Sequence, residues 1–194
     1  GTPQMAERNT TRLLGKRLIY VALWLGLVFL HLLPIDVARP SPLSAPSLLE
    51  RIWTGPDLHL AITFAWVLRR PEYVPPILVA GTFLMSDLLL QRPPGLWAAL
   101  ALIGSEALRS RAPGLRDLTF LMEWLNVATT MLAMFLGYRI ILGVMMIEAG
   151  PLSPTIVQAV VTIAVYPVVV VLSQLLFGVR KLAPGDIDGM EART

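Results

Sequence analysis

Six apolar segments, separated by short polar stretches, make up most of this chain. They lie at about residues 18–35, 57–68, 74–90, 96–108, 118–147 and 155–179. A soluble domain of this length leaves a large share of its surface in water and needs polar residues to cover it. Here 55% of the 194 residues are hydrophobic and only 15% are charged, whereas soluble domains carry about 25%. The pattern therefore predicts one all-α integral membrane domain.

The lengths of the segments are uneven. An upright helix needs about 20 residues to cross a bilayer. Segments 57–68 and 96–108 are shorter, so we expect them to use flanking residues or a locally thinned bilayer. Segment 118–147 is longer and is expected to tilt, kink or protrude. With these allowances, the sequence predicts six transmembrane helices.

The basic residues predict the orientation, because cytoplasmic loops carry an excess of Lys and Arg. If both ends of a six-helix chain are cytoplasmic, twelve basic residues lie inside and three outside, with Arg139 left within a span. An odd number of spans would lose this asymmetry. The outside residues are Arg39, Arg51 and Arg92, and the inside residues are Arg8, Arg12, Lys16, Arg17, Arg69, Arg70, Arg109, Arg111, Arg116, Arg180, Lys181 and Arg193.

This topology divides the chain into a cytoplasmic segment 1–17, a six-helix membrane domain 18–180 and a cytoplasmic tail 181–194, which is expected to be disordered. Residues 1–4 precede Met5 and resemble a cloning remnant, so they carry no weight in the fold prediction. The net charge of +3 does not indicate nucleic-acid binding, because the basic clusters follow the membrane pattern. The chain has no cysteine, which excludes thiolate metal sites and disulfides.

Ionisable residues within membrane spans are costly and are functional hypotheses by default. Asp57 opens the second segment after Pro56, where the helix dipole favours a carboxylate, so a helix start is its simplest interpretation. Asp87 lies near the C-terminal end of the third segment, where the dipole disfavours an anion. We expect it to have a partner, and to form either a pinned helix end or a contact with a ligand or a partner protein. The candidates are Arg92, His59 and the indole N–H of Trp97.

Other charged residues lie near the ends of the segments. Glu106 precedes Arg109 by one helical turn, which favours an ion pair. Glu123 is expected at a similar depth, reaching the cytoplasmic interface and pairing with Arg109, Arg111 or Arg116. Arg139 is expected to extend outward or to meet Asp87 or Asp57.

Three further features concern packing. Pro167 removes the helical donor for the Ile163 carbonyl and should kink the last helix. Residues 47–53, ending at Trp53, are expected to form an amphipathic turn at the outer membrane interface. A stripe of small residues permits close helix contact in the fourth segment; it comprises Ala98, Ala101 and Ser105.

No motif predicts catalysis or a cofactor. The chain has no P-loop and no HExxH sequence, and His31 and His59 are too far apart in sequence to suggest a metal site. The sequence DGMEAR at residues 188–193 matches the start of the CDP-alcohol phosphotransferase signature. That signature needs further aspartates downstream, which the chain lacks, so we set the match aside. We therefore expect no catalytic, metal or cofactor site.

Residues 55–108 carry a family-like pattern. It reads Pro56-Asp57, then Trp66-Val-Leu68, then Arg70-Pro-Glu72, and then Ser86-Asp87-Leu-Leu followed by Pro94-Gly95-Leu96. With Pro167 and the closing Arg180-Lys181 pair, this pattern resembles the rod shape-determining protein MreD family over about half of the chain. The segment 36–56 is longer than in short family members, and Gly81 stands where the family often has several glycines.

The resemblance implies a fold similar to the substrate-binding subunits of energy-coupling factor transporters. It also implies a non-enzymatic scaffold of the bacterial cell-elongation complex in the cytoplasmic (inner) membrane. Its partners would be MreC, RodA and a class B penicillin-binding protein, MreB indirectly, and membrane lipid. The site candidates are then structural or partner-binding. They are Trp53, Asp57, Asp87, Arg92, Pro94, Gly95, Arg139 and Pro167.

An alternative function is a small-molecule-binding membrane subunit of an energy-coupling factor type transporter. It would need an outward pocket with convergent polar groups, for which the sequence offers Asp57, His59, Asp87 and Trp97.

Overall fold

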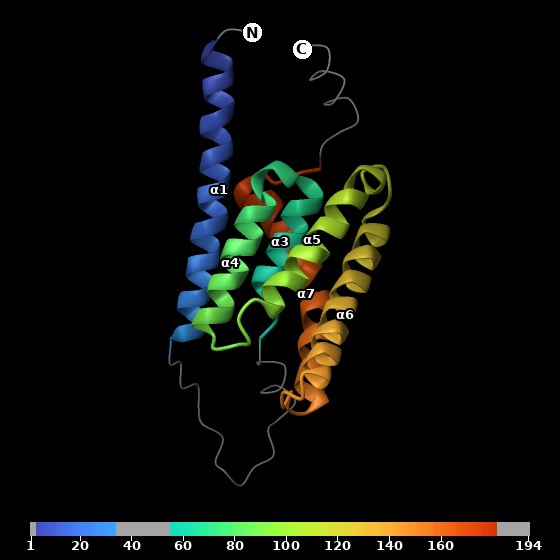
Figure 1. The fold of residues 1–194 in the computed structure, drawn as a ribbon. Coiled ribbons are helices and arrows are strands. Elements are labelled where there is room, and N and C mark those ends of the chain that lie inside the picture. The colour runs from blue at the N-terminus through green and yellow to red at the C-terminus, as the bar shows by residue number, and fades with distance from the viewer. Residues whose placement is uncertain (1–2, 34–54, 182–194) are drawn as a thin grey trace.

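The computed structural model describes residues 3–33 and 55–181, and within these ranges it is helical and contains no strand. The helices carry the labels of Figure 1. They are α1 (Pro3–Leu32), α3 (Leu58–Arg69), the 3-10 helix η1 (Pro71–Tyr73), α4 (Pro76–Leu89), α5 (Leu96–Leu115), α6 (Phe120–Val144) and α7 (Leu152–Phe177). The expected all-α fold is thus confirmed for the described residues.

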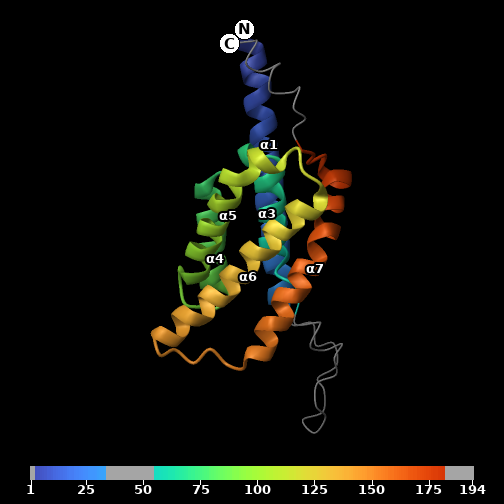
Figure 2. The ribbon, with the colours of Figure 1, turned by 90° about the vertical axis from the view of Figure 1, so that its right-hand side faces the viewer.

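The helices run up and down, and their connections alternate between two ends of the bundle (Figure 1, Figure 2). The start of α1, the turn η1, the α5–α6 connection and residues 178–181 lie at one end, which we call the N-terminal end. The α4–α5 and α6–α7 connections lie at the opposite end, which we call the far end. Toward the N-terminal end, α1 extends beyond the other helices (Figure 1).

Helix α3 is the centre of the bundle. Most of its residues are buried, among them Phe64 and Trp66, and it packs mainly against α7 and α5. A helix that is apolar and covered all round belongs to an interior. At a rise of about 1.5 Å per residue, its 12 residues extend over only about 18 Å, so both of its polar ends lie within the bundle.

Three helices are long and apolar enough to cross a membrane, namely α1 from Glu7 onward, α6 and α7. Their outward faces are apolar and exposed, as at Phe29, Leu136 and Leu175. Surfaces of this kind are stable where lipid covers them. Helices α3 and α4 are apolar but shorter. The protein therefore has the architecture of an α-helical membrane protein.

Most helix boundaries lie within a turn of the prediction, and two differ by more. Helix α5 continues through Pro113 to Leu115, beyond the expected end at residue 108, because Leu108, Ala112 and Leu115 face the interior and are buried. Helix α1 begins at Pro3, so the described part of segment 1–17 is continuous with the first span. The expected turn at 47–53, with Trp53, and the tail sequence 188–193 lie outside the described residues.

The small-residue stripe of α5 is confirmed as a packing surface, since Ala98, Ala101 and Ser105 are all buried. The closest approach occurs at Gly104, which the sequence analysis did not single out. A Cβ atom there would lie 2.8 Å from Met134 Sδ on α6 and 3.1 Å from Phe64 Cζ on α3. Glycine at this position allows α5 to pack against both helices.

Pro167 lies inside α7, as predicted. The Ile163 carbonyl, which proline leaves without its helical donor, accepts a hydrogen bond from Trp124 Nε1 of α6 at 2.9 Å. The carbonyl that Pro167 leaves without a helical donor in α7 therefore forms a hydrogen bond to α6.

Candidate functional site

Asp57 joins three helices at the far end. Its Oδ1 accepts the backbone N–H of Leu60 at 3.0 Å and so caps α3, which confirms the helix-start interpretation. Its Oδ2 accepts the indole N–H of Trp97 on α5 at 3.2 Å. Its own backbone N–H donates to Thr162 Oγ1 on α7 at 3.0 Å.

Asp87 is fully buried at the end of α4 and caps the neighbouring helix. Its Oδ2 accepts the backbone N–H groups of Gly95 at 3.2 Å and Ala98 at 3.1 Å, both at the start of α5. These are donors that a helix N-terminus leaves without an internal partner. Gly95 has φ +86°, a conformation that glycine adopts without strain. It brings the turn close to the carboxylate.

Arg92 forms the predicted ion pair with Asp87, with 3.5 Å between Arg92 Nε and Asp87 Oδ1. The geometry is too loose for a hydrogen bond, and neither atom has a hydrogen-bond partner among the described residues. The contact is thus mainly an attraction between charges. The other two candidates were wrong for Asp87, because Trp97 binds Asp57 and His59 binds Tyr20.

Together these residues form a single structural joint, which we call the outer corner after the side of the membrane that the sequence predicts for it: Asp57, Asp87, Arg92, Gly95 and Trp97. Two carboxylates from different helices hold Trp97 and Ala98, which are consecutive residues in the first turn of α5. Pro94 lies exposed in the turn that precedes Gly95. The outer corner fixes the far ends of α3, α4 and α5 relative to one another, and Asp57 also connects it to Thr162 within α7.

Arg139 does not reach the outer corner. Its guanidinium donates to the carbonyls of Ala149 at 2.6 Å and Gly150 at 3.0 Å, in the α6–α7 connection. Arg139 therefore extends toward the far end, and the alternative of an ion pair with Asp57 or Asp87 is wrong. That this end faces outward stays a prediction. Arg139 stabilises this connection instead.

Polar contacts attach α1 to the bundle. They were not predicted from the sequence. Thr63 Oγ1 donates its one hydrogen to the His59 carbonyl at 2.7 Å. It must therefore accept the hydrogen bond from the Tyr20 hydroxyl, at 2.7 Å. The Tyr20 oxygen is then left to accept Nε2–H of His59 at 3.1 Å. The Trp24 indole donates to Ser86 Oγ at 2.7 Å. Tyrosine and tryptophan in an apolar segment are signals for such contacts, because their polar atoms need partners when buried.

The partners of Glu123 differ from the predicted ones. It is fully buried, and its carboxylate lies 3.3 Å from the Arg69 guanidinium and 3.0 Å from Lys181 Nζ. The hydroxyl of Tyr166 also donates to Glu123 Oε1, at 3.2 Å. We call these four residues the ion cluster. It connects the end of α3, the first turn of α6, the middle of α7 and the segment that follows α7.

The expected partners of Glu123 on α5 are engaged elsewhere or do not contact it. Arg109 pairs with Glu106 at 3.0 Å, as predicted, and also donates to the carbonyls of Pro71 and Val74. It therefore anchors α5 to the α3–α4 turn. Arg69 was not predicted as a partner of Glu123, because the position of Arg69 beside α6 depends on how α3 packs within the bundle.

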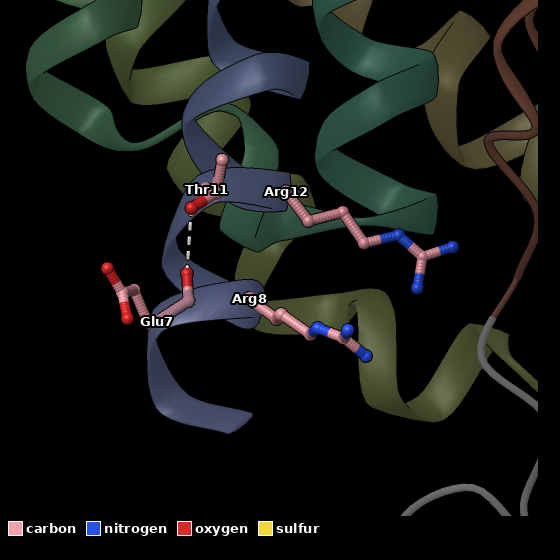
Figure 3. A pocket seen from close by; sticks show the side chains of 4 residues that line it. All are labelled: Glu7, Arg8, Thr11 and Arg12. Atoms are coloured by element: carbon pink, nitrogen blue, oxygen red, sulfur yellow. Dashed lines mark hydrogen bonds between the residues drawn. The ribbon is translucent and has the colours of Figure 1, made fainter. Parts of the chain in front are cut away.

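Among the hollows on the described part of the chain, we consider two at the N-terminal end. The larger, about 600 Å³, lies along the free end of α1 between Glu7, Arg8, Thr11 and Arg12 (Figure 3). All four side chains are exposed on one helix, and their one mutual contact is the Thr11 hydroxyl donating to the Glu7 carbonyl. The smaller, about 400 Å³, lies between α6 and α7 and is lined by Arg69, Glu123 and Lys181 of the ion cluster. Only the second has buried charges that could bind a ligand.

Within residues 3–33 and 55–181, no three His, Cys, Asp or Glu side chains are grouped closely enough to hold a metal ion. The buried carboxylates instead contact helix N-termini, an indole and cationic side chains. Comparisons with models of protein families, with curated proteins and with solved structures found no match.

Proposed function

We propose that this chain is a non-enzymatic scaffold subunit of the bacterial cell-elongation complex, as the resemblance to the MreD family implies. It would span the cytoplasmic membrane six times with both ends in the cytoplasm. It would bind MreC and help to couple MreB filaments to the peptidoglycan synthase formed by RodA and a class B penicillin-binding protein.

The observation that carries this proposal is the outer corner. Asp57, Asp87 and Gly95 come from three separate pieces of the family-like pattern, and they meet in one hydrogen-bonded joint. The two carboxylates cap α3 and α5, so their role there is to fix helix ends. A pattern that specifies the relative positions of helix ends favours a scaffold.

The other parts of the pattern also have structural contacts. Trp66 is buried and its indole donates to Ser173 Oγ on α7 at 3.1 Å. Arg70 pairs with Glu72 at 3.4 Å in the turn between α3 and α4. These contacts support the packing of the central helix and its connection.

The proposed orientation is supported by the arrangement of the loops. The described basic residues assigned to the cytoplasm lie on the parts of the chain that meet at the N-terminal end (Figure 1). The polar groups that the transporter alternative needs for a ligand are bonded within the protein, as Asp57 with Trp97 and Asp87 with the start of α5. This arrangement favours the scaffold over the transporter.

Depletion of the protein in its source bacterium tests the proposed function. Depleted cells are expected to lose their rod shape and become round, and expression of the wild-type chain should restore the shape. Rod-shaped growth that continues after the protein has disappeared, as measured by microscopy and immunoblotting of the same cultures, would overturn the proposal.

A further inference from the structure

The cavity between α6 and α7 combines charged and apolar walls. Its charged wall holds two cations, Arg69 and Lys181, against the single carboxylate of Glu123. Arg69 is 5% exposed, Glu123 is not exposed, and Lys181 is 24% exposed. The cavity wall therefore carries a net charge of one positive unit in a largely buried setting, where charges are weakly screened.

Hydrogen-bond donors exceed acceptors in this wall. Both oxygens of Glu123 are already engaged by the Tyr166 hydroxyl, Arg69 and Lys181. A guanidinium has five N–H donors and an ammonium three, with no acceptor in either. Lys181 also donates to the Leu115 carbonyl at 3.3 Å, while Nε of Arg69 is buried with no partner among the described residues. This donor excess suits an additional anion.

Apart from Gln174, the rest of the cavity is apolar and adjoins the membrane-facing surface. This apolar part is lined by Phe120, Pro167, Val170 and Val171. Val171 is 50% exposed and Phe120 is 38% exposed, so the cavity borders the outward faces of α6 and α7. A ligand that fits this arrangement has an anionic head and an apolar tail.

We propose that this cavity binds a phospholipid of net negative charge in the adjacent leaflet, with Lys181 and Arg69 contacting its phosphate and the apolar wall contacting an acyl chain. Basic pockets between transmembrane helices on the cytoplasmic side recognise lipid head groups in this way. Glu123 acts as a positioning residue, because it holds both cations at the cavity. The leaflet is the cytoplasmic one under the orientation proposed above, but the site does not depend on the scaffold function.

The test is native mass spectrometry of the full chain, released from nanodiscs that contain phosphatidylcholine with or without phosphatidylglycerol. Wild-type protein is expected to retain phosphatidylglycerol in preference to phosphatidylcholine. Lys181→Gln should weaken retention by about fivefold, the usual contribution of one basic side chain to binding of anionic lipid. Arg111→Gln is the matched control, since Arg111 is exposed on α5 near the same end and should have no effect.

A second variant keeps the charges unchanged. Val171→Trp fills the apolar part of the cavity and should abolish retention. Val168→Trp is its control, because Val168 lies on the same helix, is 55% exposed and does not line the cavity. Thermal unfolding of each variant in detergent shows whether the fold is intact.

The outcomes separate the possible ligands. Preferential retention of phosphatidylglycerol that is lost in Lys181→Gln and Val171→Trp, but not in the controls, supports the proposal. Equal retention of both lipids, or equal loss in variants and controls, would overturn it. Binding of inorganic phosphate in detergent without any lipid preference would assign the site to a soluble anion and also overturn it. None of these results depends on MreC, so the proposed function is tested separately.

Discussion

Asp87 lies at the C-terminal end of α4, where the helix dipole is unfavourable for a negative charge, and yet its side chain is fully buried. It is stable there because it faces the start of α5, whose free N–H groups at Gly95 and Ala98 point toward it. The favourable end of one helix therefore compensates for the unfavourable end of another. This pairing attaches the end of α4 to the start of α5.

Replacing Asp87 with Ala should lower the free energy of unfolding by about 1–3 kcal/mol, because it leaves the buried N–H of Ala98 and the partly buried N–H of Gly95 without an acceptor. Asp87→Asn keeps an acceptor oxygen and should cost less. Thermal or denaturant unfolding in detergent measures both. We also expect Asp87→Ala to weaken MreC retention or rod shape.

Asp117→Ala is the control, because Asp117 is exposed. If Asp87→Ala unfolds like the wild type, the capping role is refuted. If it is present at normal levels and leaves both cell shape and MreC retention unchanged, the outer corner has no role in partner binding.

Residue partners were predictable from the sequence only where they are close along the chain. Asp87 with Arg92 and Glu106 with Arg109 were both predicted, because a turn or a helix brings such neighbours together. The partner of Glu123 was not, since Arg69 is 54 residues away and its position depends on helix packing. The sequence showed that a buried charge needs a partner but did not show which one.

At the scale of helices, Pro167 and Trp124 form a pair that neither sequence segment indicates alone. Proline leaves a carbonyl of α7 without a donor, and the indole of α6 supplies one. Trp124→Phe should cost about 0.5–1.5 kcal/mol of unfolding free energy, the usual net contribution of a hydrogen bond.

A double-mutant cycle tests this pairing. Pro167→Ala restores a backbone N–H for the Ile163 carbonyl, so Trp124→Phe should cost less in that background. The measurement is the unfolding free energy of the four proteins in detergent. An equal cost of Trp124→Phe in both backgrounds would show that the two residues are not coupled.

Gly104 sets the distance between α5 and its neighbours. Gly104→Val should destabilise the protein by about 1–3 kcal/mol, because overfilling a packed interior forces side chains and backbone to shift. Gly81→Ala on α4 is the control, since a Cβ there meets nothing within 4 Å, and it should be neutral or stabilising. If both variants have the same unfolding midpoint in detergent, the close approach at Gly104 is not required.

The six α-helices that the structure describes were predictable from hydrophobic segments alone, because a long run of apolar residues is a strong signal. The ends of these helices were not predictable in this way. Helix α5 continues past residue 108 since its last two turns bury Ala112 and Leu115, which depends on packing in three dimensions. The glycine contact at residue 104 depends on the same packing.

For the whole molecule, the proposed orientation can be tested with single cysteines, because the chain contains none. Met146→Cys lies in the α6–α7 connection, where Met146 is 94% exposed, and should react with an impermeant maleimide in spheroplasts whose membrane is intact. Arg111→Cys, near the N-terminal end, should react only after the membrane is permeabilised. The reverse pattern of labelling would contradict the orientation with both ends in the cytoplasm.

Capture of the protein from solubilised membranes tests whether it associates with the elongation complex. The membrane is solubilised in mild detergent, the tagged chain is captured, and the co-purifying proteins are identified by mass spectrometry. We expect to recover MreC together with RodA and its class B penicillin-binding partner. Recovery of an ATP-binding-cassette module or a tightly bound small molecule, without MreC, would contradict it and identify the chain as a transporter subunit.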